Sequence, residues 1–289
     1  MKRLLSTLLM ALAIGCLTAS AQNDSEGKYT LKNGNITMVI DAAKGGKILS
    51  FKYGDQESIS QLRWPEAFGS TFWTSPQKEW YWPPVPEYDK KPYTVEEKDG
   101  VLCMISEVND KLKYRIRKMF KPDGQAIAVT YSIINESDEV RKVAPWEITR
   151  VQNEGGLIFF EAPVEGITPA GLMNFKEAYG AAWYQTDETN ENRKINVDGK
   201  GWLAYCANGL LLVKQFEDLD ASQPAPDEAE IQVYVNRGKA HIELESQGAY
   251  TTLKPQEQLS WTVRWYLQPC NQVSEPSEAL MQQVRKLLK

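Results

Sequence analysis

The chain is poor in the residues that metal enzymes and nucleic-acid binders need. Its 289 residues include one His and four Cys, and 33 Lys and Arg stand against 38 Asp and Glu. A single His argues against a His-rich metal centre or a classical zinc enzyme. The net charge of −5 argues against nucleic acid as a partner, because a DNA or RNA binder needs a basic face. With 42% hydrophobic and 25% charged residues, the composition is that of a globular protein, not of a disordered chain.

Short catalytic motifs are missing as well. The sequence contains no G-x-S-x-G elbow, no Walker loop and no dinucleotide-binding fingerprint. It also has no internal repeat and no low-complexity linker, so we predict one domain after the N-terminal segment.

The N-terminus is typical of a secretory signal peptide. Met1-Lys2-Arg3 is basic, residues 4–17 are apolar, and Ala19-Ser20-Ala21 carries the small residues that signal peptidase requires. We predict cleavage after Ala21 and a mature chain of residues 22–289 in the periplasm or outside the cell. The apolar run is shorter than the ~20 residues of a membrane-spanning helix, so we expect no integral membrane segment in the mature chain. Processing as a lipoprotein at Cys16 is the alternative.

Export places the remaining cysteines in an oxidising compartment. Cys103, Cys206 and Cys270 show no C-x-x-C spacing, so they form no metal or redox motif. Cys103 and Cys206 lie in apolar runs, which favours buried free thiols and leaves any pairing open.

Alternating hydrophobicity predicts a chain built almost wholly of β-strands. The alternation is clearest at 259–267, and Pro122-Asp123-Gly124 predicts a hairpin between strands at 112–120 and 125–134. One helix is expected, at 277–288. Further strands are predicted at 36–40, 47–51, 143–151, 157–161, 202–206, 209–216, 230–236 and 240–246. Many closely spaced strands with almost no helix predict an all-β fold, a large antiparallel sandwich with a short C-terminal helix.

An aromatic, Pro-rich stretch interrupts this pattern at residues 61–93. It holds four of the nine Trp and six of the fifteen Pro. Trp80 and Trp82 could stack on the C–H face of a sugar ring, with Gln77 bonding its hydroxyls, and the prolines would hold the loop in one shape. Equally, these Trp could close one end of the sandwich as core.

The strand predicted at 240–246 carries an imidazole and two carboxylates on one face. His241, Glu243 and Glu245 alternate with apolar Ile242 and Leu244, at ~7 Å intervals. Such a group could perform general acid–base chemistry. The alternation alone favours a solvated outer face with ordinary charges.

The strand predicted at 143–151 places Trp146, Glu147 and Arg150 in an apolar frame. Charges in such a frame are paired or functional, because burying them alone is costly. Arg150 could hold a sugar carboxylate or a ring oxygen, and a structural ion pair is the alternative.

No metal site or cofactor is predicted. The acidic stretch 185–200 could supply oxygen ligands to Ca²⁺, but it matches no defined calcium loop.

Several segments resemble galactose mutarotase-like proteins. Residues 36–40 followed by Gly45-Gly46-Lys47-Ile48-Leu49-Ser50-Phe51 resemble the opening strands of that superfamily, and Leu244-Glu245-Ser246-Gln247 resembles the Leu-Glu-x-Gln segment of aldose epimerases. Residues 253–257 and 261–267 resemble the closing turn and last strand. The resemblance spans most of residues 30–267, through order and spacing more than identity. Ser75-Pro76-Gln77, residues 80–84 and residues 144–150 resemble an uncharacterised family of secreted bacterial proteins in the superfamily.

The resemblance implies a β-supersandwich with a carbohydrate groove on one sheet and Glu245 as the general base at the anomeric hydroxyl. The catalytic His of the epimerases has no counterpart in residues 145–151, and His241 lies before the Glu instead. Arg150, Glu147 or a Tyr would have to replace it. Arg is a poor proton donor, since its pKa exceeds ~12, but it can stabilise negative charge.

We therefore expect an exported carbohydrate-recognising protein, with Glu245, Arg150 and Glu147 as candidate catalytic residues. Its candidate substrate-binding residues are Gln77, Trp80, Trp82, Trp146, His241 and Glu243. Whether it is an epimerase-type enzyme stays open. The alternative is a non-catalytic sandwich that binds a glycan or a protein partner.

Overall fold

The computed structural model describes residues 22–24, 26–63, 66–238 and 240–289. The predicted signal peptide, with Cys16, lies outside these residues, as do Trp64 and Pro65 of the aromatic stretch. No helix of the described ranges is long and apolar enough to cross a membrane.

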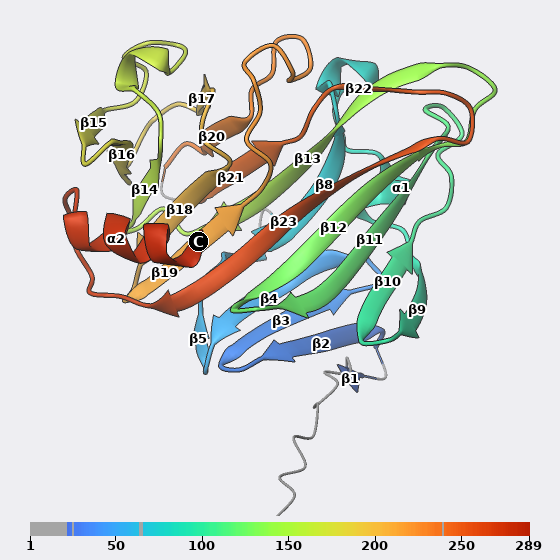
Figure 1. Ribbon diagram of the computed structural model, residues 1–289, viewed down its shortest axis with the longest axis horizontal. Helices are drawn as coiled ribbons and strands as arrows, with labels where there is room; N and C mark the ends of the chain where they lie inside the picture. Colours follow the sequence, from blue (N-terminus) through green and yellow to red (C-terminus); the bar gives the residue numbers. More distant parts are fainter. Residues whose placement is uncertain (1–21, 25, 64–65, 239) are drawn as a thin grey trace, which may run out of the picture.

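Two antiparallel sheets pack face to face (Figure 1). The first sheet has the order β1-β2-β3-β4-β8-β13-β21-β20-β17, with β5 paired to β4 and β22 paired to β13. Its strands are β1 (Gln22–Asn23), β2 (Lys28–Asn33), β3 (Ile36–Asp41), β4 (Lys47–Tyr53), β5 (Gln56–Glu57), β8 (Ser70–Ser75), β13 (Arg141–Val151), β17 (Arg193–Val197), β20 (Ile231–Val235), β21 (Ile242–Gln247) and β22 (Thr251–Leu253).

The second sheet has the order β15-β16-β14-β18-β19-β23-β12-β11-β10-β9. Its strands are β9 (Thr94–Lys98), β10 (Val101–Ile105), β11 (Tyr114–Asp123), β12 (Ala126–Asn135), β14 (Leu157–Phe160), β15 (Phe175–Ala178), β16 (Ala181–Gln185), β18 (Trp202–Ala207), β19 (Leu210–Gln215) and β23 (Gln258–Pro269). A small ribbon of β6 (Gln61–Leu62) and β7 (Ala67–Phe68) and a short helix, α1 (Pro86–Asp89), lie in the connection around β8. The predicted all-β antiparallel sandwich is confirmed.

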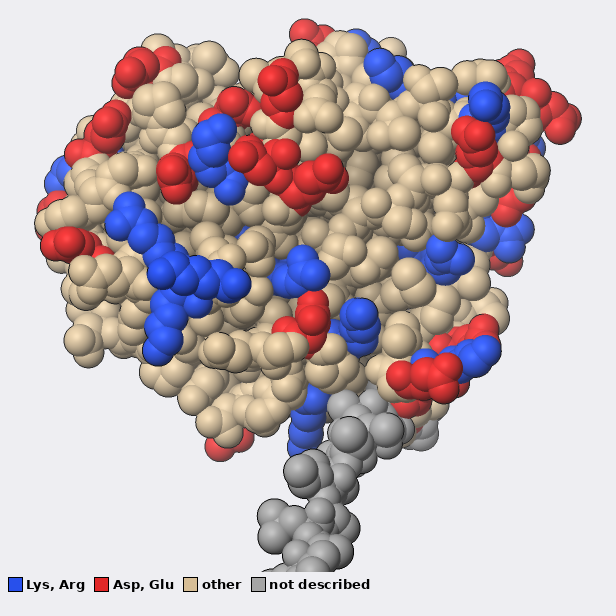
Figure 2. Space-filling view, viewed as in Figure 1, with Lys and Arg blue, Asp and Glu red and all other residues tan. Residues whose placement is uncertain are grey.

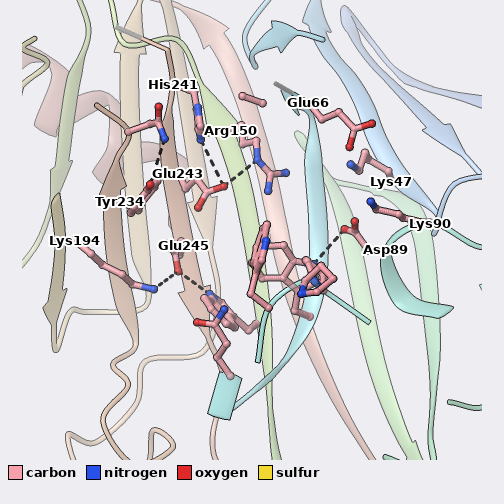
Figure 3. A pocket seen from close by; sticks show the side chains of 18 residues that line it. Lys47, Glu66, Asp89, Lys90, Arg150, Lys194, Tyr234, His241, Glu243 and Glu245 are labelled. Carbon is pink, nitrogen blue, oxygen red and sulfur yellow. Dashed lines mark hydrogen bonds and ion pairs between the residues drawn. The ribbon is translucent and has the colours of Figure 1, made fainter. Parts of the chain in front are cut away.

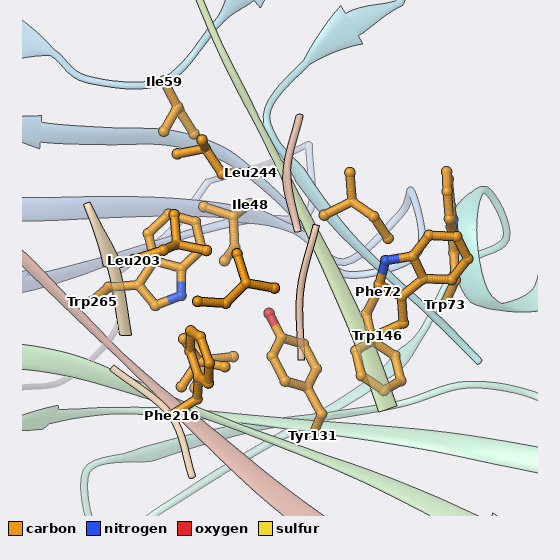
Figure 4. Close-up of a cluster of buried hydrophobic side chains, with 14 of the residues drawn as sticks. Ile48, Ile59, Phe72, Trp73, Tyr131, Trp146, Leu203, Phe216, Leu244 and Trp265 are labelled. Atoms are coloured by element: carbon orange, nitrogen blue, oxygen red, sulfur yellow. The ribbon is translucent and has the colours of Figure 1, made fainter. Parts of the chain in front are cut away.

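Aromatic side chains from both sheets meet in the core between them (Figure 4). Phe72 of β8 stacks on Tyr131 of β12 at 4.3 Å between ring centroids, and Phe51 of β4 meets Trp265 of β23 edge to face at 5.2 Å. These residues face inward because successive side chains of a strand point to opposite faces of its sheet.

The core also encloses an ion pair between the two sheets. Glu147 of β13 pairs with Lys214 of β19, and both side chains are fully buried. Tyr131 and Trp265 donate hydrogen bonds to Oε1 of Glu147, at 2.6 and 3.0 Å, and Lys214 donates to Thr149 at 2.8 Å. These partners offset the cost of burying both charges.

The predicted C-terminal helix is α2 (Glu278–Leu287), which packs on the outer face of the second sheet (Figure 1). Ser277 caps it by accepting a hydrogen bond from the backbone N–H of Leu280. Arg285 and Lys286 lie in the last turn, where positive charge complements the helix dipole. Figure 2 shows Lys and Arg side chains gathered on this part of the surface.

Two stretches for which the sequence predicts no strand, one aromatic and one acidic, contain strands of the first sheet. Residues 61–93 include β8, and residues 185–200 include β17. All six residues of β8 are buried, so its sequence does not alternate between apolar and polar residues. The hydrophobic pattern therefore does not predict this strand. The polar residues of β17 include Lys194, which faces the site described below.

Two of the three cysteines lie close together. The Sγ atoms of Cys206, at the end of β18, and Cys270, just after β23, are 3.3 Å apart, and both are free thiols. The hydrogen bond from Cys270 lowers the pKa of Cys206. Cys206 is buried as predicted, whereas Cys103 and Cys270 are half-buried.

Candidate functional site

A cavity of about 600 Å³ lies on the face of the first sheet that points away from the core (Figure 3). Neighbouring strands β4, β8, β13, β21, β20 and β17 each contribute side chains to it. Its size is within the range of small-molecule sites. The lining residues are Lys47, Glu66, Ala67, Trp73, Gln77, Trp82, Pro83, Pro84, Asp89, Lys90, Trp146, Arg150, Lys194, Tyr234, Asn236, His241, Glu243 and Glu245.

Strand β21 supplies the acidic floor of the cavity. Glu243 and Glu245 point into it, while Ile242 and Leu244 are fully buried in the core on the opposite face. The favoured expectation of a solvated outer face is therefore corrected, because only 1% of Glu245 is exposed. The sequence predicts the alternation along β21. It does not predict the burial of this face, because the segments that cover the face lie far from β21 in the sequence.

Arg150 and Glu243 form a cross-strand ion pair on the cavity floor. They are direct partners in the β13–β21 register, and Nε of Arg150 lies 2.9 Å from Oε1 of Glu243. Nε2 of His241 lies 3.8 Å from the same oxygen. Burial opposes ionisation of Glu243, but Arg150 and His241 outweigh it and lower the pKa of this carboxyl. Glu243 therefore remains a carboxylate that orients its neighbours.

Glu245 has a different environment, which leaves one oxygen facing the cavity. Trp146 and Lys194 both donate to Oε2, at 2.8 and 3.0 Å. No side chain of the described ranges forms a hydrogen bond with Oε1. Burial, together with the negative charge of Glu243, raises the pKa of Glu245 despite Lys194. A carboxylate with a raised pKa and a free oxygen is suited to accept and return a proton.

Aromatic rings form one wall of the cavity. Trp73 of β8 meets Trp146 and Trp82 edge to face, with ring centroids 5.3 and 6.1 Å apart. Trp82 is 71% exposed at the rim. Trp80 instead packs behind Trp73 and Trp146, is 8% exposed, and donates its indole N–H to the backbone of Thr74 at 2.8 Å. Of the two predicted platform residues, Trp82 lies at the cavity and Trp80 belongs to the core.

Asp89, at the end of α1, faces the cavity from the side of β4. Its Oδ1 accepts hydrogen bonds from Thr71 and from the indole of Trp73, at 2.5 and 3.1 Å. Burial opposes its ionisation, but Lys47 and these two donors together lower its pKa.

Most of the predicted site residues meet at this cavity. Those that line it are Gln77, Trp82, Trp146, Arg150, His241, Glu243 and Glu245. Glu147 does not reach it, because a residue next to Trp146 on a strand must point to the other face and so enters the core. This placement corrects the expectation that Glu147 is a catalytic partner of Glu245.

Sequence reasoning missed several residues of the cavity: Lys47, Glu66, Trp73, Asp89, Lys90, Lys194, Tyr234 and Asn236. Tyr234 could have been found, since its strand was predicted and it is the direct register partner of Glu243. Asp89 and Lys90 carry no local signal, because they come from the connection after β8.

The described residues contain no group of three or more His, Cys, Asp or Glu side chains placed to hold a metal ion. In the acidic stretch 185–200, Asp187 pairs with Arg193 and accepts a hydrogen bond from Tyr184.

Comparison with known proteins identifies the fold. No family model matches the sequence, and no curated protein matches it. Among solved structures, a candidate aldose 1-epimerase from Klebsiella pneumoniae matches with a TM-score of 0.61 at 13% identity, covering 91% of this chain and 84% of that one. A candidate aldose 1-epimerase from Escherichia coli K12 matches with 0.60 at 13% identity, covering 84% and 99%. A galactose mutarotase-like protein from Clostridium acetobutylicum matches with 0.58 at 10% identity, covering 87% and 99%.

The chain thus has the galactose mutarotase-like fold, as the sequence resemblance implied. At these identities the likeness establishes the architecture, and the activity has to be argued from the cavity itself.

Proposed function

We propose that the protein recognises a carbohydrate in the cavity over β4, β8, β13, β21, β20 and β17. One observation carries the proposal: an aromatic wall of Trp73, Trp82 and Trp146 and the carboxyl groups of Glu243 and Glu245 line one cavity that is large enough for a sugar. Aromatic rings pack on the apolar C–H face of a sugar, and buried carboxylates accept hydrogen bonds from its hydroxyls. The aldose epimerase names of proteins with this fold support the same class of ligand.

We further propose that Glu245 is the general base of an anomer interconversion. Interconversion requires a base at the anomeric hydroxyl and an acid at the ring oxygen, and the two exchange roles in the reverse direction. Glu245 presents its free Oε1 as the base. Arg150 stabilises negative charge that develops on the sugar, because its guanidinium stays protonated. His241 and Tyr234 line the cavity beside Glu243 and can each donate a proton, which makes them candidate acids.

Glu245→Gln is expected to remove catalysis and to spare binding. The amide keeps the shape of the side chain but cannot accept the proton, so anomer exchange should slow by roughly 10²- to 10⁴-fold. Anomeric-proton exchange spectroscopy of the mature protein with neutral, amino and acidic sugars measures both exchange and binding. Glu96→Gln, on the exposed edge strand β9, is the matched control.

The outcomes separate three functions. Exchange that survives Glu245→Gln would disprove the role of this residue. Sugar binding without exchange in the unaltered protein would establish the alternative, a non-catalytic sugar-binding protein. The position of the only His beside Glu243 favours that alternative, since no imidazole is paired with Glu245. Binding of no sugar would contradict the proposal and leave a protein partner as the ligand to seek.

We also propose that the protein is exported, by cleavage after Ala21 or as a lipoprotein through Cys16. In an oxidising compartment the neighbouring thiols of Cys206 and Cys270 should form a disulfide. The reaction is thiol–disulfide exchange with a small-molecule disulfide, which accepts the two electrons and two protons and leaves as two thiols. The bond would close a loop across 64 positions and stabilise the protein by about 2–4 kcal/mol. Mass spectrometry of the protein from the cell envelope should show either Gln22 or lipid-modified Cys16 as the first residue, and Cys206 linked to Cys270. Retention of residues 1–15 together with free thiols at Cys206 and Cys270 would contradict export.

A further inference from the structure

Two cations point into the same space at one end of the cavity: Arg150, which is paired with Glu243, and Lys47, which forms no ion pair with the described residues. Lys47 is 9% exposed and Arg150 is 8% exposed, and both line the cavity. They lie on β4 and β13, two strands apart with β8 between them, a separation of about 10 Å across the sheet. Figure 3 shows the ammonium of Lys47 and the guanidinium of Arg150 directed toward one another.

The ammonium of Lys47 is unusual because it is buried without an ion pair. No carboxylate of the described residues lies within 4.0 Å of its Nζ, and none of them accepts a hydrogen bond from it. Its contact is the ring of Phe68, with Nζ 4.9 Å from the centroid. Burial lowers the pKa of Lys47, which Asp89 partly offsets and Arg150 reinforces. An anion that enters the cavity would stabilise the charged form of this buried amine, which burial alone disfavours.

Arg150 has unused hydrogen-bond donors at the same end of the cavity as Lys47. Its Nε is taken by Glu243, but its two terminal nitrogens form no hydrogen bond with the described residues. A guanidinium presents its N–H groups in a planar fork that matches a carboxylate or a sulfate. The Glu243 contact therefore holds the fork in place while leaving its outer edge for a ligand.

The nearby acids do not fill this role. Oδ1 of Asp89 already accepts hydrogen bonds from Thr71 and Trp73, and Asp89 forms no ion pair with Lys47 within 4.0 Å. Lys90 lines the same end and also lacks an ion pair among the residues that the structure describes. Glu66, just before β7, lies near Lys47 in Figure 3 and its negative charge acts on that ammonium, but the two form no ion pair within 4.0 Å. Glu245 lies toward the other side of the cavity with Lys194. Near β4, the ammonium of Lys47 and the terminal nitrogens of Arg150 therefore remain available as hydrogen-bond donors to a ligand, and toward β17 Glu245 offers its free carboxylate oxygen.

We propose that the ligand is an acidic sugar, whose carboxylate or sulfate binds between Lys47 and Arg150 while its ring packs against the tryptophan wall. This inference rests on the proposed carbohydrate function and narrows it to one substrate class. Lys47 and Arg150 set the specificity, because a neutral sugar would leave the ammonium of Lys47 without an ion pair and the terminal nitrogens of Arg150 without a charged acceptor. The ring then extends toward Glu245, which is where the chemistry proposed above takes place.

Matched pairs of sugars test the inference by titration calorimetry. The pairs are glucuronate with glucose, galacturonate with galactose, and galactose 6-sulfate with galactose. We expect the acidic member to bind roughly 10- to 100-fold more tightly, the range of a charge-assisted hydrogen bond in a buried site. The sulfate and carboxylate arms distinguish the two sources of the anionic group.

Lys47→Met should abolish this preference and leave the affinity for the neutral sugar within about threefold. Lys47→Arg should restore much of the preference, because it keeps the charge. Lys52→Met, on the same strand but outside the cavity, is the control for the loss of a lysine. Thermal melting of each variant shows that it is folded.

The results distinguish this inference from the proposed function. Equal affinity for acidic and neutral sugars, or equal weakening of both by Lys47→Met, would overturn the acidic-sugar inference and leave carbohydrate recognition intact. Failure to bind any member of the three pairs would count against both.

Discussion

Lys214→Met is expected to lower the free energy of unfolding by about 3–5 kcal/mol, the cost of leaving a buried charge unpaired. Lys214 and Glu147 are both fully buried between the sheets. Removal of the ammonium leaves Glu147 with hydrogen bonds from Tyr131 and Trp265 but without an opposite charge. Chemical denaturation at pH 7 measures the loss.

The double variant Lys214→Met/Glu147→Gln should recover much of that stability. The amide oxygen of Gln can still accept from Tyr131 and Trp265, and no charge is then buried without a partner. Lys52→Met, which removes a lysine outside the core, should change stability by no more than about 0.5 kcal/mol. A loss below about 1 kcal/mol for Lys214→Met would show that Glu147 takes up a proton or reaches water at little cost.

Trp80→Ala and Trp82→Ala are expected to have opposite consequences although the residues are two positions apart. Trp80 is 8% exposed, packs against Trp73 and Trp146, and holds the backbone of Thr74. Its removal leaves a cavity and an unpaired carbonyl, so we expect a loss of about 3–5 kcal/mol of stability.

Trp82 is 71% exposed at the rim, so its truncation should cost less than about 1 kcal/mol of stability. It should weaken sugar binding roughly tenfold, because a stacked aromatic face is lost. Thermal melting and ligand titration of both variants provide the comparison, and Tyr81→Ala, at an exposed neighbour, controls for the loss of surface area. Unchanged affinity of Trp82→Ala would remove Trp82 from the binding surface.

The strand pattern was largely readable from local sequence. The alternation at 259–267 became β23 (Gln258–Pro269), and the amphipathic segment at 277–288 became α2 (Glu278–Leu287). Strand β8 was missed because it is buried on both faces and is flanked by Trp and Pro, which resemble the composition of a loop. A pattern search detects a difference between two faces, and a strand that is buried on both has none to detect.

The candidate site was readable only in part. The spacing of Glu243 and Glu245, and of Trp146 and Arg150, placed each pair on one face of its strand, and both pairs line the cavity. Lys47, Asp89 and Lys194 join them from β4, from α1 and from β17, and no local signal relates these segments to β21. Their contribution depends on the order of strands in the sheet.

The amino-acid sequence by itself determined the strands, the C-terminal helix and the alternation of side chains along each strand, because these depend on neighbours a few residues apart. Only the tertiary structure decided which face became the core and which became the cavity. Glu147 entered the core and Arg150 the cavity since the second sheet covers one side of β13 and the segment around Trp82 borders the other. Burial by distant parts of the chain raised the pKa of Glu245 and lowered that of Lys47, which forms no ion pair with the described residues.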